Sequence, residues 1–152
     1  MTIAIANRQR LAPLDRKTLR ALCTRLLRDH GRDADLSLCY VANAEIRTLN
    51  TQFLGRDEIT DVLAFPFDDV AQPPPAVSSG FPEEDRLLGE IIVSVEKAVA
   101  EAGKRRIPIA REIALYTAHG LLHLLGYDDH TPADRRRMRR AERAALAAEG
   151  LL

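Results

Sequence analysis

The 152-residue chain has no tryptophan, and only 5% of its residues are aromatic. Single-stranded nucleic acids usually stack on aromatic rings, so this scarcity predicts weak reading of base sequence. An excess of either charge is also missing, because 22 lysines and arginines balance 22 aspartates and glutamates. Whole-chain electrostatics therefore predict neither a nucleic-acid binder nor a binder of acidic ligands, and any such preference must come from local patches.

Long apolar runs are absent too, since no stretch approaches the roughly 20 residues that cross a bilayer. Residues 1–7 lack the basic start and sustained apolar region of an export signal. Cysteine is rare, and Cys23 and Cys39 have no metal-type spacing, which predicts buried free thiols. We expect a cytoplasmic protein with no membrane partner.

Apolar periodicity predicts the order of the secondary-structure elements. Strands are expected at residues 1–6, 36–41, 61–65 and 87–95, and helices at 14–27, 43–53, 96–102, 109–124 and from 132 onward. The mixture predicts the α/β (α+β) class, with a single domain over residues 1–152 and a small mixed sheet of about four strands packed against about five helices. Residues 72–85, rich in proline and acid, are expected to form a surface loop.

Three of the four histidines fall within twelve residues, which predicts a metal site at the end of the helix in the C-terminal half. His119 and His123 are four apart, so both imidazoles project from one helix face and can reach one ion. Gly126 is expected to end the helix, and the turn after it to bring back His130. Three imidazoles suit a zinc ion with a position open for water or substrate. The alternative is a set of ordinary core or surface histidines.

The chain resembles the YbeY family of bacterial rRNA maturation factors, which are metal-dependent single-strand endoribonucleases. Four blocks carry this resemblance over most of the length: Leu49-Asn50 followed by Phe53, residues 57–66 (DEITDVLAFP), residues 88–94 (LGEIIVS) and residues 119–128 (HGLLHLLGYD). The resemblance implies hydrolysis of RNA phosphodiester bonds in 16S rRNA 3′-end maturation and ribosome quality control. It also implies one Zn²⁺ ion held by three histidines, with precursor rRNA and the small ribosomal subunit or its proteins as partners.

Two positions depart from the family pattern. The family usually places its third ligand directly after the aspartate that corresponds to Asp128, and here Asp129 occupies that position, with His130 one residue later. We favour His130 as the third ligand and keep Asp129 as the alternative, since zinc also accepts a carboxylate. Many relatives carry an arginine near the scissile phosphate where this chain has Leu54. Arg56 is the nearest substitute, and a solvated loop arginine is the competing interpretation.

Asp128 and Arg56 are the candidate catalytic residues. Asp128 is a candidate base or proton relay, although it equally fits a partner of a metal ligand or a turn residue. Glu112 lies on the helix face of His119 and is expected to be an exposed helical glutamate. A zinc protease carries a glutamate directly after its first histidine, and Gly120 stands there, which argues against peptide hydrolysis.

Phosphate contacts are expected from Arg56, from the connector 104–106 and from the arginine-rich run 135–140. Arginines on successive helix positions point around the whole axis, so a solvated face that pairs partly with Asp134 and Glu142 is the competing interpretation. Two other functions also fit the chain. One is a non-catalytic, zinc-containing ribosome assembly factor, and the other is a metal-dependent hydrolase of another phosphoester or of peptides.

Overall fold

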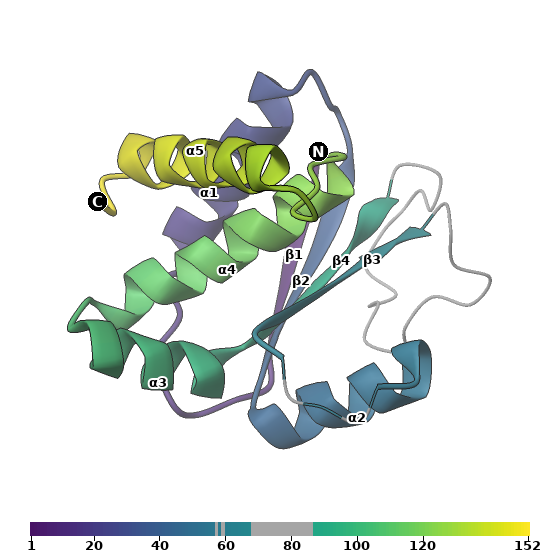
Figure 1. Cartoon of the computed structure of the whole chain (residues 1–152), viewed down its shortest axis with the longest axis vertical. Helices are drawn as coiled ribbons and strands as arrows, with labels where there is room; N and C mark the ends of the chain where they lie inside the picture. The colour runs from purple at the N-terminus through teal and green to yellow at the C-terminus, as the bar shows by residue number, and fades with distance from the viewer. Residues whose placement is uncertain (57, 59, 68–86) are drawn as a thin grey trace.

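The computed structural model describes residues 1–56, 58, 60–67 and 87–152 (Figure 1). Within them the chain forms one α/β domain with five α-helices and a four-stranded sheet. The elements run β1 (Ile3–Asn7), α1 (Arg16–Asp29), β2 (Asp35–Val41), α2 (Asn43–Leu54), β3 (Val62–Pro66), β4 (Leu87–Ser94), α3 (Val95–Arg105), α4 (Ile109–Leu124) and α5 (Pro132–Ala148). The expected loop at 72–85, together with Asp57 and Ile59, lies outside the described residues.

The sheet is mixed, as the sequence predicted, with strand order β1-β2-β4-β3. Strands β1 and β2 pair in parallel, as do β2 and β4, whereas β3 pairs antiparallel with β4. Because β3 is an edge strand, it tolerates Pro66 at its last position, where the missing N–H costs no ladder bond on the open side. The central strand β2 is buried at every position, as expected for a strand covered on both faces.

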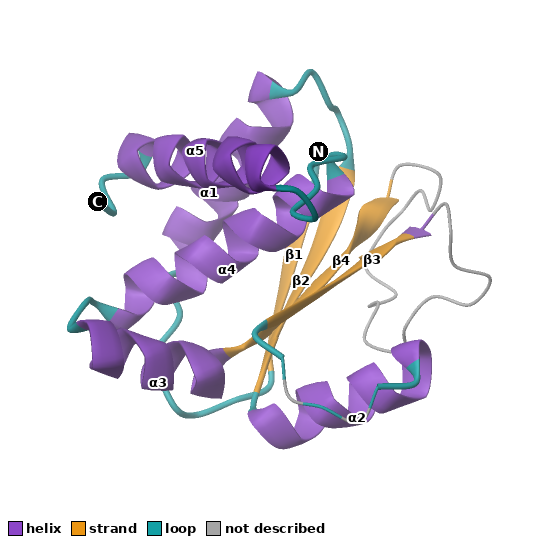
Figure 2. Cartoon of the chain, in the orientation of Figure 1, coloured by secondary structure: helices purple, strands orange, loops and turns teal. Residues whose placement is uncertain are grey.

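Helices cover the two faces of the sheet unequally. Helices α1 and α4 pack on one face, with α5 lying over these two helices, and α2 packs on the other face (Figure 2). Alternation along the strands sorts the side chains: Leu38 and Ile91 belong to the cluster under α1 and α4, whereas Cys39 and Ile92 belong to the cluster under α2. Helix α4 therefore lies against the sheet, which gives its histidines a rigid support.

Helices α1 and α5 begin within two residues of their expected starts, and both cysteines are buried as expected. The Asp15 side chain caps α1 by accepting from the Thr18 N–H, and the Thr131 side chain caps α5 by accepting from the Asp134 N–H. Cys23 and Cys39 are buried free thiols, and burial raises the pKa of each to about 12. In the described part of the chain, no helix has the length and apolarity needed to cross a membrane.

Two glycines allow α4 to approach the sheet closely. A Cβ on Gly120, in α4, would lie 2.7 Å from Cγ2 of the buried Ile91. A Cβ on Gly89, in β4, would lie 2.5 Å from the Phe65 carbonyl oxygen and 3.0 Å from Cδ1 of Leu124. The Phe65 carbonyl oxygen belongs to the backbone, so it cannot rotate away from a Cβ at position 89. The end of the histidine helix thus depends on a glycine in the strand beneath it.

Replacement of Gly89 by alanine should lower the free energy of unfolding by about 1–3 kcal/mol, the usual cost of overpacking a core. The matched control is Gly103→Ala in α3, where an added Cβ meets nothing within 4 Å. This control should gain stability by about 0.5–1 kcal/mol, because alanine is the better helix former. Urea unfolding of both variants measures the difference. Equal stability of the two variants would contradict the close approach.

Candidate metal centre

His119 and His123 lie one turn apart on α4, and their imidazoles face each other. Their ring centroids are 4.6 Å apart, and the two Nε2 atoms are 3.1 Å apart. Both side chains are partly exposed. Two nitrogens at this separation, on adjacent turns of a buried helix, form a preorganised half of a metal site.

A turn after α4 brings a carboxylate to this pair. The helix ends at Leu124, and Gly126 takes a φ of 99°, the left-handed region in which glycine is favoured. The chain then reverses, and the Tyr127 N–H donates back to the Leu122 carbonyl over 2.9 Å. Asp129 Oδ2 consequently lies 3.5 Å from His123 Nε2 and 3.7 Å from His119 Nε2.

These three atoms match the spacing of ligands around one small ion. Donors about 2.0–2.1 Å from a tetrahedral zinc ion are about 3.3 Å from one another. The separations here are 3.1 Å, 3.5 Å and 3.7 Å. Two imidazole nitrogens and one carboxylate oxygen are an accepted zinc donor set, and three protein ligands leave the fourth position open. His119, His123 and Asp129 therefore form the candidate metal group.

His130 lies outside this group and instead forms a second cluster of possible ligands with Asp128 and Asp129. Its side chain is 82% exposed, and its Nε2 lies 3.1 Å from Asp128 Oδ1. The same Asp128 oxygen accepts from the Asp129 N–H over 2.8 Å. The structure thus brings the alternative ligand Asp129 to the histidine pair, and places the favoured ligand His130 beside Asp128 on the exposed side of the turn.

Glu142, from α5, orients His119. Its Oε1 accepts from His119 Nδ1 over 2.8 Å, and the Glu142 side chain is only 12% exposed. Because a carboxylate only accepts, Nδ1 carries the proton, which leaves the Nε2 lone pair of the neutral ring free for an ion. Burial lowers the pKa of His119. The hydrogen bond and charge of Glu142, together with the charges of Asp61 and Asp129, raise this pKa by more than burial lowers it, so the net pKa lies above the ordinary value.

Contacts from α1 and α5 hold the turn that carries Asp129. His30, after α1, accepts at Nε2 from the Tyr127 hydroxyl over 2.9 Å, while its Nδ1–H donates to the Leu26 carbonyl. Arg137 lies over the Tyr127 ring, 5.6 Å from its centroid. Arg135 donates to the carbonyl oxygens of Asp129 and His130, each over 3.3 Å. The turn is therefore fixed by residues far apart in sequence.

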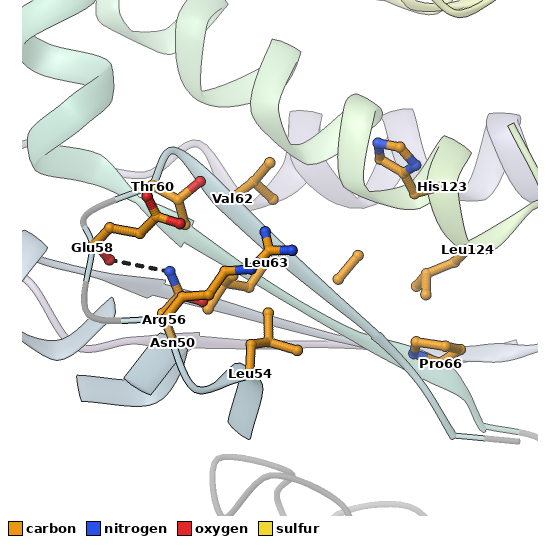
Figure 3. Close-up of a pocket in the computed structure, with 11 residues that line it drawn as sticks. Asn50, Leu54, Arg56, Glu58, Thr60, Val62, Leu63, Pro66, His123 and Leu124 are labelled. Carbon is orange, nitrogen blue, oxygen red and sulfur yellow. Dashed lines mark hydrogen bonds between the residues drawn. The ribbon is translucent and has the colours of Figure 1, made fainter. Parts of the chain in front are cut away.

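A cavity of about 470 Å³ opens beside the metal group, between α4 and the loop after α2. His123 lies on one wall, and Arg56 and Leu54 lie on the opposite side (Figure 3). The cavity also contains Asn50, whose Nδ2 donates to the Glu58 carbonyl over 3.1 Å. The structure thus places the candidate Arg56 on a cavity that it shares with a metal-ligand candidate.

Sequence reasoning missed the roles of two glutamates. The competing interpretation of the arginine run paired Glu142 with some of those arginines, whereas the structure pairs it with His119. The available signal was its position four residues after Met138, which is buried. The expectation that Glu112 is exposed was wrong: its side chain is 1% exposed and lies 3.7 Å from Arg105. Glu112 is buried by tertiary packing, because the end of α3 covers this part of α4.

Comparisons with known proteins identify similar chains. Residues 4–150 match the family described as endoribonuclease YbeY. An endoribonuclease YbeY of Anaeromyxobacter sp. (strain Fw109-5) is 40% identical over 156 residues, covering 100% of this chain and 74% of the relative. One of Alkaliphilus metalliredigens (strain QYMF) is 36% identical over 159 residues, covering 100% of this chain and 97% of the relative.

The solution structure of TM1509 from Thermotoga maritima has a similar fold. Its TM-score is 0.61 at 24% sequence identity, and the match covers 97% of this chain and 91% of that one. At this identity the likeness concerns the fold alone. It supports the arrangement of helices and sheet that carries the candidate metal group.

Replacement of Glu142 by glutamine should lower the pKa of His119 in the metal-free protein, because the variant loses the negative charge beside the imidazole. A folded-state pKa above the ordinary 6.5 means that protonated His119 stabilises the fold below that pH. This contribution is lost as the pH rises through the folded-state pKa. The variant should therefore lose more stability, relative to wild type, in acid than in alkali.

Histidine NMR titration and urea unfolding on both sides of neutrality measure the two effects. The control is Glu149→Gln, which removes a glutamate that pairs with Arg25 over 3.1 Å at the far end of α5. It should leave the pKa of His119 unchanged. An unchanged His119 pKa in Glu142→Gln would refute the assigned hydrogen bond.

Proposed function

The chain belongs to the endoribonuclease YbeY family, and from this membership we propose that it is a metal-dependent endoribonuclease that hydrolyses phosphodiester bonds in single-stranded RNA. The observation that carries the proposal is the group of His119, His123 and Asp129, with donor atoms 3.1–3.7 Å apart beside an open cavity. A three-ligand site with an open position is typical of catalytic rather than structural zinc.

The biological setting of this activity follows from the family resemblance. We propose that the RNA is precursor 16S rRNA, cleaved during 3′-end maturation and ribosome quality control, with the small ribosomal subunit or its proteins as partner. The chain has few aromatic residues on which bases could stack, so specificity would come from such a partner. A cytoplasmic location fits the two buried free thiols.

Zn²⁺ is the proposed ion, because imidazole and carboxylate donors at these separations suit its tetrahedral preference. When bound, such an ion would act as a Lewis acid, which lowers the pKa of a water molecule bound to it and polarises a phosphoryl oxygen. We propose Asp129 as the third ligand instead of His130. Glu142 holds the proton of His119 at Nδ1 and keeps Nε2 directed at the ion.

Arg56 and Asp128 receive different roles in this proposal. Arg56 lies on the cavity next to His123, where its guanidinium can hold a phosphate of the substrate by two parallel hydrogen bonds. Asp128 accepts from the Asp129 N–H and contacts His130, so it positions the ligand turn. A proton relay through Asp128 would require the substrate to approach from the exposed side of the turn.

A non-catalytic assembly factor is the second candidate function. The observation that favours it is Leu54, which is 50% exposed on the cavity at the position where many relatives carry an arginine. In that case the ion would stabilise only the junction between α4 and α5. Peptide hydrolysis is disfavoured, because Gly120 occupies the position of the protease glutamate and packs against the sheet.

The test compares zinc content and cleavage of a labelled single-stranded RNA for wild type, His123→Ala, Asp129→Ala and His130→Ala. His123→Ala and Asp129→Ala each remove a donor atom, so both should lose zinc and reduce cleavage at least about 100-fold. His130→Ala should keep both properties, because its side chain lies outside the donor group. Elemental analysis and gel assays supply the two measurements.

Each alternative gives a different result. Loss of zinc and cleavage in His130→Ala, with both retained in Asp129→Ala, would identify His130 as the ligand. A wild type that holds zinc, binds small-subunit particles and cleaves no RNA would favour the assembly factor. Turnover of generic phosphoesters with no turnover of RNA would favour a hydrolase of another substrate.

A further inference from the structure

Two cavities adjoin on the His119 side of the metal group, away from the Arg56 cavity. The inner cavity, of about 300 Å³, reaches His119 and Lys97. The outer cavity, of about 320 Å³, reaches Arg111, Arg139 and Arg143. They share four lining residues, Arg105, Glu112, Leu115 and Glu142, and therefore form one groove between α3, α4 and α5.

Arginine dominates the outer end of this groove. Four arginines line the outer cavity, against two glutamates. Arg139 and Arg143 are one turn apart and share a face of α5, and Arg111 projects from the first turn of α4. Three guanidinium groups from two helices thus converge on one depression.

The acids in the groove already have partners. Glu142 accepts from His119, Glu112 lies 3.7 Å from Arg105, and Glu101 lies 3.4 Å from Lys104. Asp61 accepts from the Val62 N–H over 2.8 Å. Glu112 and Glu101 are thus each paired with a cation, whereas Asp61 and Glu142 line the His119 end of the groove.

Three of the basic side chains that line the outer cavity, unlike the acidic ones, lack partners among the described residues. Across residues 1–56, 58, 60–67 and 87–152, the side chains of Arg111, Arg139 and Arg143 make no ion pair or hydrogen bond. Lys97 contributes only its backbone N–H, which donates to Ser94. Guanidinium groups that converge without carboxylate partners are suited to phosphate.

We infer that this groove binds the phosphate backbone of the RNA strand on the His119 side of the scissile bond. The inference rests on the proposed function. It adds to the metal site a second surface that binds the substrate, formed partly by α5. Arg111 is eight residues before His119, so it lies about 12 Å along α4 from the metal group. The groove therefore engages nucleotides beyond those at the reacting phosphate.

The structure separates the arginines of α5 by role. Arg135 and Arg137 contact the turn that carries Asp129. Arg139 and Arg143 line the groove, whereas Arg136 and Arg140 line neither of its cavities and are exposed. The last pair carries the same charge on the same helix, and so provides a matched control.

The test measures binding of a labelled 20-nucleotide single-stranded RNA by fluorescence anisotropy over a salt series, with cleavage assayed in parallel. Arg139→Gln/Arg143→Gln should raise Kd about tenfold, and should reduce the slope of log K against log salt by about 1.4, for two lost single-strand phosphate contacts. Arg136→Gln/Arg140→Gln should keep Kd within about twofold of wild type. Thermal melts verify that both variants fold.

Binding and cleavage together separate the two proposals. Equal Kd values and slopes for the two double variants would overturn the groove, even if wild type cleaves RNA. The expected binding pattern without any cleavage would support the groove and overturn the endoribonuclease. A wild type that neither binds nor cleaves RNA would overturn both.

Discussion

The hydrogen bond between Glu142 and His119 is the interaction on which the candidate site depends. It joins α5 to α4 across the sequence and sets the proton of His119 on Nδ1. Since Nδ1 is occupied, Nε2 is the only ring nitrogen of the neutral imidazole that can bind an ion. Without this bond His119 could present either tautomer, and its Nε2 atom would have no fixed relation to His123 and Asp129.

The rest of the fold serves to hold this arrangement. Gly89 and Gly120 let α4 lie close to the sheet, and the Tyr127–His30 contact ties the ligand turn to the end of α1. The metal group then stands between two depressions, one reached by Arg56 and the other by the groove arginines. A balanced total charge thus conceals a group of arginines in the groove between α3, α4 and α5, beside the metal group.

Much of the fold could be predicted from the sequence, because its signals are local. Apolar periodicity marked the strands and helices, and the spacing of His119 and His123 placed two imidazoles on one face. The third donor could not be predicted this way. Whether Asp129 or His130 returns to the pair depends on the φ of Gly126 and on remote anchors. The role of Glu142 and the burial of Glu112 likewise depend on helix packing.

The decisive measurement is anomalous diffraction from crystals of the zinc-loaded protein, recorded on both sides of the zinc absorption edge. We expect one anomalous peak about 2.0–2.2 Å from His119 Nε2, His123 Nε2 and an Asp129 carboxylate oxygen, with Glu142 still bonded to His119 Nδ1. A peak coordinated by His130, or by His119 through Nδ1, would contradict this expectation.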